Sequence, residues 1–421
     1  MIEESEYKKR REVLAKKLKK NSITLLFSAT QKIRSNDTEF PYRQESNFYY
    51  LTGFKEDNSC LMIIKKRKTT QHILFVAKKD PLHELWNGKR VGVKHAKKIF
   101  VYDAIYAMET LSAKLQKLGN IFDTFYYDFK NTSGQTLTRE LYAIPTHKNI
   151  VKKIQKMRLI KSPAEVELIK KAIAITKEAH HFAMKNAREL RYEYELQAGI
   201  EYVFKKNGAY SDAYTSIVAC DNAANTLHYI TNDKPLVDKK LILIDAGCEY
   251  KYYASDITRT IPVNGKFTSA QRELYTMVLS VQLEILAMIK PNTKRSDLQK
   301  EAVKLLTQGM IKLGILKKSF KKCIKNELYK KYYPHGIGHW MGMDVHDECP
   351  YKTKKGKEIP LSAGMVLTIE PGIYLDENDT SIPKKYRGIG IRIEDDVLIT
   401  QEGCENLSQG IAKTIQEIES I

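Results

Sequence analysis

Four acidic residues in the C-terminal half of the chain lie at the ends of apolar runs or within them. Asp245 ends the run LILID, Glu370 ends VLTIE, and Asp256 and Glu394 lie within two further stretches with the composition of strands. A buried carboxylate is costly unless a cation compensates it, so four of them constrain the fold more than any other feature. One such acid alone would be an ordinary strand end or surface ion pair. The four together favour strands that converge on a shared cation.

A glycine-rich stretch supplies histidines to the same half of the chain. It runs from Tyr333 to Asp347 and reads YPHGIGHWMGMDVHD. His335 and His339 are four residues apart, which would stack them on one face of a helix, but the glycines disfavour a helix interior. We therefore expect a tight loop that leads into a strand. His346 could join the other two imidazoles if the chain doubles back, whereas each histidine alone would be an ordinary polar loop residue.

These groups form an oxygen-rich set of metal donors. His339 and the four acids are enough for two divalent ions if one or two carboxylates bridge them. A set of oxygens with a single nitrogen favours Mn²⁺ or another hard ion over the Cys and His sets of structural zinc. Two ions about 3.5–4 Å apart share and deprotonate a water and stabilise an oxyanion. We therefore expect two divalent metal ions as cofactors, with Mn²⁺ as the metal.

The chain divides where a strong helix start occurs. Ser162-Pro163-Ala164-Glu165 is a capping box with proline at the first helical position, followed by apolar residues at helical spacing. A length of 421 residues also exceeds one ordinary core. We predict an N-terminal α/β domain over residues 1–157 and a second domain over residues 158–421 that carries the chemistry.

Periodicity and turn residues predict the elements of both domains. In the first, we expect helices over 5–20, 107–118 and 136–141 and strands over 23–27, 47–51, 60–64 and 72–77. In the second, we expect helices from 163 and over 193–205, 268–289 and 296–313, the last two each opened by a capping box. We also expect short strands around 217–228 and strands over 241–245, 252–263, 365–369 and 389–400. Alternation along the last strand places Arg392 and Glu394 on one face.

Composition limits the partners and the compartment. The net charge of +20 is dispersed in short lysine-rich runs, which predicts a solvated surface and no nucleic-acid partner. No stretch approaches the length of a membrane span, and the charged N-terminus lacks the apolar run of a signal peptide. The six cysteines are scattered without a C-x-x-C pair, as expected of free thiols in a reducing compartment. We therefore predict a cytoplasmic protein with no membrane association.

Motifs over nearly the whole chain are close to those of one family. They are RSNDTEFPYRQ and YLTGF in the first domain, then LILIDAGCEYKYYASDITRTIPVNGKFT, HGIGHWMGMDVHD, VLTIEPGIY and YRGIGIRIEDD. The chain thus resembles the pita-bread metallopeptidases, and within them the Xaa-Pro aminopeptidase (aminopeptidase P) branch. The resemblance implies an α/β (α+β) fold class, with an N-terminal creatinase/prolidase-type α/β domain and a C-terminal pita-bread metallopeptidase domain. It also implies a homodimer or homotetramer.

The resemblance implies a role for each motif residue. Asp245 would hold one metal ion, Asp256 and Glu394 would bridge both, and His339 and Glu370 would hold the other. The catalytic residues would be Glu370, which takes a proton from the bridging water, with His228 of NTLHY, which stabilises the carbonyl oxygen, and His346. The residues that position the proline and the downstream peptide would be His335, Tyr374 and Arg392.

The implied reaction is hydrolysis of the N-terminal Xaa-Pro bond of peptides through a metal-bridging hydroxide, with release of the first residue. The substrates would be peptides with proline at the second position. Within the family, the alternatives are an Xaa-Pro dipeptidase (prolidase) and, more distantly, a methionine aminopeptidase. Outside it, they are a creatinase-like amidinohydrolase and a non-catalytic basic binding protein on the same fold, against which the complete ligand set argues.

Overall fold

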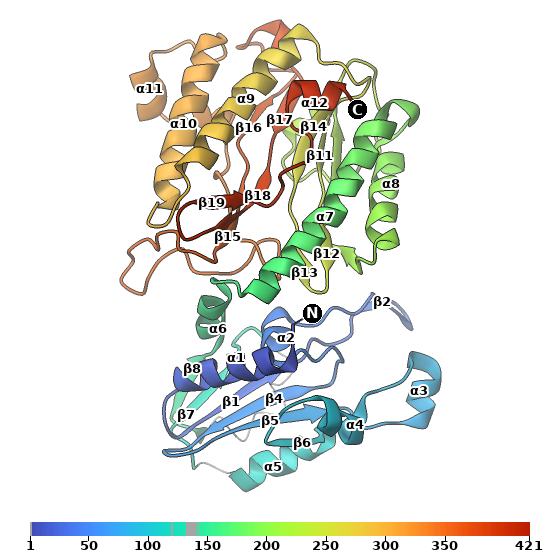
Figure 1. Cartoon of the computed structure of the whole chain (residues 1–421), viewed down its shortest axis with the longest axis vertical. Coiled ribbons are helices and arrows are strands. Elements are labelled where there is room, and N and C mark those ends of the chain that lie inside the picture. The colour runs from blue at the N-terminus through green and yellow to red at the C-terminus, as the bar shows by residue number, and fades with distance from the viewer. Residues whose placement is uncertain (1, 119–120, 132–140, 142) are drawn as a thin grey trace. The chain divides into compact units, whose positions relative to one another are not determined.

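The computed structural model describes residues 2–118, 121–131, 141 and 143–421, and the chain divides into two compact units (Figure 1). The N-terminal unit is Met1–Met157 and the C-terminal unit is Arg158–Ile421. Of the helix expected over 136–141, all but Leu141 lies outside the described residues. No helix in the described part of the chain is long and apolar enough to cross a membrane.

The N-terminal unit is built on a six-stranded sheet with the strand order β6-β5-β4-β1-β7-β8. Strand β4 pairs antiparallel with β1 and β5, and the other three pairs are parallel. The residues of β1 that point to one face share an apolar core with helix α5. The strands of this sheet are β1 (Ser22–Phe27), β4 (Cys60–Lys65), β5 (Thr70–Val76), β6 (Ala104–Ala107), β7 (Thr124–Tyr127) and β8 (Thr146–Asn149). The other elements are α1 (Glu4–Lys16), β2 (Ile33–Ser35), β3 (Thr38–Glu39), α2 (Ser46–Thr52), α3 (Pro81–Asn87), α4 (Gly92–Ile99), α5 (Leu111–Leu118) and α6 (Val151–Arg158).

One expected strand of this unit is wrong. Residues 47–51 are aromatic and apolar, but they lie in helix α2. Glu45 caps the helix by accepting hydrogen bonds from the backbone N–H groups of Asn47 and Phe48, and Gly53 ends it in the left-handed conformation at φ 64°. All seven residues of the helix are buried, so its side chains show no polar face from which the period could be read.

The C-terminal unit places strands between two pairs of helices, α7 with α8 and α9 with α10 (Figure 1). Its described strands form three three-stranded sheets, β10-β11-β14, β13-β12-β9 and β15-β18-β19, and the antiparallel pair β16-β17. The helices are α7 (Pro163–Asn186), α8 (Glu193–Lys206), α9 (Ser269–Met288), α10 (Arg295–Lys312), α11 (Phe320–Lys325) and α12 (Ile415–Glu419). The strands are β9 (Ser211–Asp212), β10 (Ile217–Cys220), β11 (Leu241–Asp245), β12 (Cys248–Tyr250), β13 (Tyr253–Ala254), β14 (Thr258–Pro262), β15 (Val366–Ile369), β16 (Gly372–Leu375), β17 (Ile389–Arg392), β18 (Asp395–Ile399) and β19 (Cys404–Asn406).

The predicted helix start at the domain boundary is confirmed, whereas a later one is wrong. Ser162 and Glu165 form the capping box that opens α7. Helix α10 begins at Arg295, one residue before the predicted cap, and has no side-chain cap. Ser296 instead lies inside the first turn, where its hydroxyl donates a hydrogen bond to Glu358. A partner distant in the sequence therefore replaces the expected local one.

Two long strands predicted for this unit are each broken, and an acidic residue lies in each break. The stretch 252–263 divides into β13 and β14, with Asp256 between them. The stretch 389–400 divides into β17 and β18, with Glu394 between them. Of the short strands expected around 217–228, the structure has β10, and a 3-10 turn follows it from Asp221. The glycine-rich stretch is a loop as expected, but it leads only into an isolated bridge between Trp340 and Leu367.

Candidate metal centre

The two breaks lie side by side because Thr258 connects them. In the β11-β14 pair, Asp245 stands opposite Thr258. Thr258 in turn forms an isolated antiparallel bridge with Glu394, whose N–H donates to the Thr258 carbonyl over 3.1 Å. The Thr258 hydroxyl donates to Glu394 Oε2 over 2.6 Å. The β10-β11-β14 sheet therefore approaches the start of β18 at this residue, with predicted ligands on either side of it.

Three of the predicted ligands form a compact group. Asp256, His339 and Glu394 each offer a ligand atom within 4.8 Å of the other two. His339 Nε2 lies 3.3 Å from Asp256 Oδ2 and 3.8 Å from Glu370 Oε1. The ring is oriented by its Nδ1, which contacts the Trp340 carbonyl at 3.1 Å. Four of the five predicted donors thus surround one small volume.

Asp245 joins this group through buried polar contacts. Its Oδ1 accepts a hydrogen bond from the Tyr214 hydroxyl over 2.6 Å, and its Oδ2 accepts one from Arg392 Nη2 over 2.6 Å. Arg392 Nε also donates to Thr258 Oγ1 over 3.1 Å. The guanidinium therefore spans the distance from Asp245 to the hydroxyl that holds Glu394, as expected if Arg392 and Glu394 face the same side.

The three predicted substrate-binding residues lie next to one another. His335 Nε2 is 2.8 Å from the Tyr374 hydroxyl, and Arg392 Nη1 donates to the same hydroxyl over 2.9 Å. His335 Nδ1 lies 3.5 Å from Glu370 Oε2, which connects this row to the metal donors. Burial, with the charge of Arg392, lowers the pKa of His335 to about 4, so its ring is neutral near pH 7. The row therefore presents neutral hydrogen-bonding groups and one cation beside the carboxylates.

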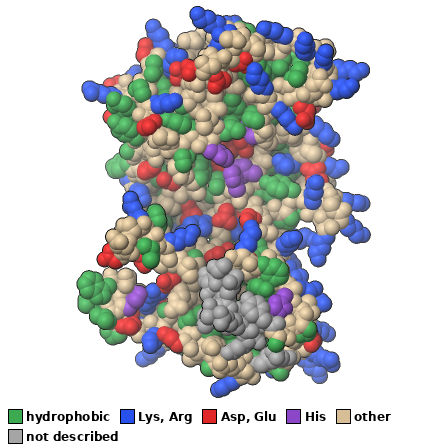
Figure 2. Space-filling model, turned by 180° about the vertical axis from the view of Figure 1, so that it is seen from behind, with side chains coloured by type: hydrophobic (Ala, Val, Ile, Leu, Met, Phe, Trp, Pro, Cys, Tyr) green, Lys and Arg blue, Asp and Glu red, His purple; other side chains and the backbone are tan. Residues whose placement is uncertain are grey.

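The remaining two predicted catalytic histidines are exposed. The His346 ring stands against His339, with centroids 4.2 Å apart and an interplanar angle of 79°. Burial and the charge of His339 lower the pKa of His346. The charge of His228 lowers the pKa of His335 as well as that of His346, so its ring lies near both. Histidine side chains of this unit gather in one place on the face seen in Figure 2.

The carboxylates are crowded beyond what the surrounding cations compensate. Burial raises the pKa of Glu370 to about 7 against the opposing charges of His339 and Arg392, and the Asp256 and Asp245 carboxylates add smaller contributions in the same direction as burial. Burial also raises the pKa of Asp245 and of Glu394. Although burial opposes it, the Asp256 and Glu370 carboxylates raise the pKa of His339 to about 9. Without metal, the raised pKa values favour protonation of these side chains, and a bound cation would displace the protons.

This donor set fits divalent metal ions. Four carboxylates and one imidazole converge, and burial raises the pKa of Glu370 and of Glu394 although Arg392 opposes it. A bound cation supplies the missing charge and restores the ionised carboxylates. Oxygen donors with one nitrogen suit hard ions.

The sequence pattern did not predict several residues that hydrogen-bond the predicted ligands. Tyr214 and Thr258 hold the carboxylates of Asp245 and Glu394 by hydroxyl hydrogen bonds. Asp396 accepts a hydrogen bond from the Asp256 N–H over 3.0 Å, although it lies in the opposite sheet. Thr258 follows Asp256 by two residues, so strand alternation could have drawn attention to it. Tyr214 carried no such signal.

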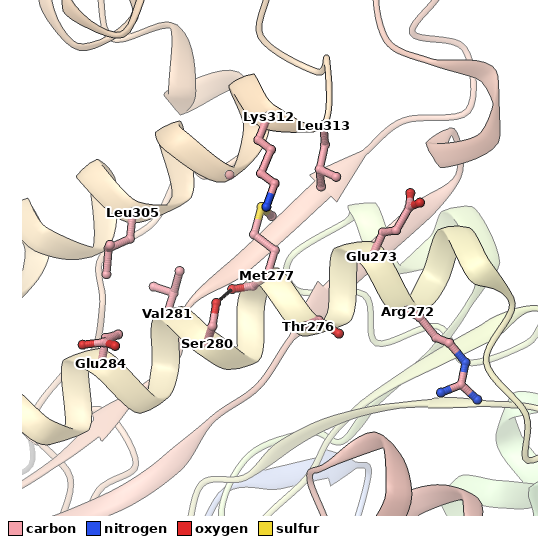
Figure 3. Close-up of a pocket in the computed structure, with 11 residues that line it drawn as sticks. Arg272, Glu273, Thr276, Met277, Ser280, Val281, Glu284, Leu305, Lys312 and Leu313 are labelled. Carbon is pink, nitrogen blue, oxygen red and sulfur yellow. Dashed lines mark hydrogen bonds between the residues drawn. The ribbon is translucent and has the colours of Figure 1, made fainter.

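A pocket lies apart from these residues. It runs between α9 and α10 and has a volume of about 650 Å³ (Figure 3). Met277, Val281, Leu305 and Leu313 give it an apolar lining, and none of the predicted donors contributes to it. We therefore assign the chemistry to the carboxylate group alone.

Comparison with known proteins decides the family. Residues 167–401 match the model of metallopeptidase family M24, and residues 7–125 match that of the aminopeptidase P N-terminal domain. The first match spans more than half of the chain. The chain belongs to metallopeptidase family M24. The family predicted from the motifs is thereby confirmed.

Relatives of this M24 chain are similar along its full length. The Xaa-Pro aminopeptidases of Haemophilus influenzae and Escherichia coli are 40% and 38% identical to it, over 100% of this chain and 97% and 98% of theirs. The structure of E. coli aminopeptidase P with the inhibitor Pro-Leu is 38% identical, with a TM-score of 0.96, 100% of this chain covered and 98% of that one. Zinc-substituted E. coli aminopeptidase P in complex with product also gives a TM-score of 0.96, at 37% identity and with the same coverage of both chains.

These likenesses confirm the predicted fold class of an aminopeptidase P type N-terminal domain followed by a pita-bread domain. The roles assigned to individual residues stay predictions. The structure brings all five predicted ligands and the three substrate-binding residues together, with His346 against His339.

Proposed function

We propose that this M24 metallopeptidase is an aminopeptidase that hydrolyses the N-terminal Xaa-Pro bond of peptides and releases the first residue. The observation that carries the proposal is the row His335, Tyr374 and Arg392, which lies directly beside the converged carboxylates. Relatives named Xaa-Pro aminopeptidase match the chain over its full length, which supports the same substrate class.

The five donors would hold two divalent ions. We assign Asp245 to one ion, His339 and Glu370 to the other, and Asp256 and Glu394 to both. When bound, the ions would supply Lewis acidity and an activated water. The hydrogen bonds of Tyr214 and Thr258 orient the carboxylates for this task.

Glu370 is the residue best placed to move a proton. Its carboxylate lies among the proposed metal donors, 3.8 Å from His339 Nε2, where an ionised carboxylate can accept a proton from a water molecule in general base catalysis. The Thr368 hydroxyl lies 3.4 Å from Oε1 and His335 lies 3.5 Å from Oε2, so both oxygens are oriented. We assign His228 and His346 to hydrogen bonding of the reacting carbonyl oxygen from the exposed side.

The Xaa-Pro bond requires a dedicated site. It is a tertiary amide without an N–H, and the proline ring fixes φ near −65°, so a peptidase that binds that N–H handles it poorly. His335 and Tyr374 offer ring faces and a hydroxyl, while Arg392 offers a cation for the carbonyl beyond the proline. These residues bind the proline and its downstream peptide without using the missing donor.

Further properties belong to the same proposal. The metal is Mn²⁺, as the hard donor set favours. The protein works in the cytoplasm, which agrees with six free cysteines of which five are buried. It assembles as a homodimer or homotetramer and does not bind nucleic acid.

A peptide series tests the function. With Mn²⁺ added, we expect Xaa-Pro-Yaa peptides to be cleaved with higher kcat/KM than Xaa-Pro dipeptides, and matched Xaa-Ala-Yaa peptides to resist. A preference for the bare dipeptide would assign the chain to the prolidases. Cleavage of the alanine series would contradict proline selection, and equal turnover after chelation would contradict the metal mechanism.

A further inference from the structure

A buried group of ions lies behind the histidine loop of the C-terminal unit. The Asp347 carboxylate contacts Arg158 Nη2 through Oδ1 and lies 3.1 Å from Lys161 Nζ through Oδ2. The side chains of all three residues are at most 2% exposed. Arg158 Nη2 also lies 2.6 Å from Asp344 Oδ2, at the partly exposed edge of the group. The mechanism above uses none of these four residues.

Asp347 closes the loop that carries the site histidines. Its N–H donates to the Trp340 carbonyl over 2.8 Å, so the segment from 340 to 347 folds back on itself. His339 directly precedes this segment, and His346 is its penultimate residue. The anchored Asp347 therefore fixes the loop at the residue next to His346.

The backbone of this loop packs closely against the ion group. A Cβ atom on Gly342 would lie 2.5 Å from Asp347 Oδ2 and 2.9 Å from Lys161 Cε, so the loop backbone packs directly on the ion pair. Lys161 is held in turn, because its N–H donates to the Gly364 carbonyl over 2.8 Å. The anchor thus connects the loop to the segment before α7 and to the turn before β15.

His346 depends on this anchor because little else holds it. Its ring is exposed, and within the described residues it makes no hydrogen bond. Its one ring contact among the described residues is with His339. A buried ion pair is a poor source of net stability, whereas it can specify one arrangement of the chain.

We propose that Asp347, held by Arg158 and Lys161, is a positioning residue that sets the place of His346 in the site. The inference rests on the proposed function, which gives His346 its role. It extends that function by giving a role to the final Asp of the HGIGHWMGMDVHD motif. This residue is neither a predicted metal ligand nor one of the predicted substrate-binding residues.

A double-mutant cycle tests the inference in the full-length protein. Asp347→Asn should lower kcat for an Xaa-Pro-Yaa peptide by about 10- to 100-fold, as expected of a small misplacement. Metal content and the KM should change little. In a His346→Ala background the same substitution should lower kcat no further, because the residue through which Asp347 acts has been removed. Additive losses would overturn the proposal, since a merely structural role acts independently of His346.

Asp344→Asn is the matched control. It removes a carboxylate from the same cation and the same loop, but at the exposed edge, so kcat should fall by less than about threefold. A loss as large as that of Asp347→Asn would contradict the assignment. If Asp347→Asn fails to fold, Lys161→Met leaves Arg158 on the carboxylate and should give an intermediate loss of kcat that again disappears in the His346→Ala background.

Nuclear magnetic resonance of histidine-labelled protein separates this inference from the proposed function. The His346 ring signal, identified by its loss in His346→Ala, should shift or broaden in Asp347→Asn and stay in place in Asp344→Asn. An unmoved signal would overturn the positioning role even in an active enzyme. A displaced signal in a protein that cleaves no Xaa-Pro peptide would refute the proposed function but would support the positioning of His346 by Asp347.

Discussion

At the scale of single residues, Thr258 connects several of the side chains of the metal centre through its hydroxyl and its backbone. Its hydroxyl donates to Glu394 and accepts from Arg392, while its backbone pairs with Asp245 and Glu394. Hydroxyl partners of this kind orient metal ligands and raise affinity. The residue is therefore as much a part of the centre as the carboxylates that it holds.

Thr258→Val should weaken metal binding by about 10- to 100-fold while leaving the fold intact. The substitution keeps the shape but leaves Glu394 and Arg392 without their shared partner. Metal titration followed by calorimetry measures the affinity. Thr260→Val is the matched control on the same strand, because that hydroxyl bonds only the Arg392 backbone; equal weakening by both variants would contradict the role of Thr258.

His228→Ala should retain the bound metal and lose about 10²-fold or more in kcat, if the ring donates to the developing oxyanion. Its exposed position beside His335 and His346 motivates the expectation. Metal analysis and steady-state kinetics on the same sample measure both quantities. His95→Ala removes an exposed histidine of the N-terminal unit and should change neither. Loss of metal from the His228 variant would make it a ligand.

At the scale of elements, the sequence predicted the apolar strands and the acids at their ends, because a buried charge stands out locally. It failed where a partner distant in the sequence decides. The breaks at Asp256 and Glu394 depend on the bridge from Thr258 to the opposite sheet, and the Asp256 N–H bonds Asp396 instead of a strand neighbour. Ser296 was misassigned for the same reason, whereas helix α2 was misassigned because all of its residues are buried and no polar face shows its period. Local pattern contains no information about these contacts.

The histidine loop and β15 approach too closely for a side chain at Gly338. A Cβ atom there would lie 1.9 Å from the Thr368 carbonyl oxygen. Gly338→Ala should therefore separate His339 from Thr368, whose hydroxyl accepts from the His339 N–H, and lower both the thermal midpoint and the metal content. Gly336→Ala in the same loop meets its nearest atom at 3.5 Å and should be tolerated. Thermal unfolding and metal analysis compare the two, and equal behaviour would refute the close approach.

At the scale of the whole molecule, the excess of buried carboxylate makes the stability of the metal-free protein depend on pH. The pKa of Glu370 is raised from 4.5 to about 7, and those of Asp245 and Glu394 are also raised. Between the unfolded and folded pKa values the folded state binds more protons, so the free energy of unfolding decreases as pH rises. The pKa of His339, raised from 6.5 to about 9, has the same sign, because the stability of its charged form is lost toward pH 9.

We therefore expect the thermal midpoint of the metal-free protein to decrease from about pH 7 to about pH 9, above the range in which the lowered pKa values of His335 and His180 act with the opposite sign. Saturating Mn²⁺ should raise the midpoint most at the alkaline end, because metal binds the folded state where protons have left. Scanning calorimetry with and without metal measures both effects. A metal-free midpoint that increases over this range would contradict the charge deficit at the site.

The order of the donors along the chain has a consequence for synthesis on the ribosome. Of the five predicted donors, Asp245 emerges first and Glu394 last, and Thr258 contacts Glu394 across an isolated bridge. A nascent chain therefore exposes an incomplete set of acids until β17 and β18 have left the exit tunnel. Capture of metal by the full set of donors would therefore follow the synthesis of β17 and β18.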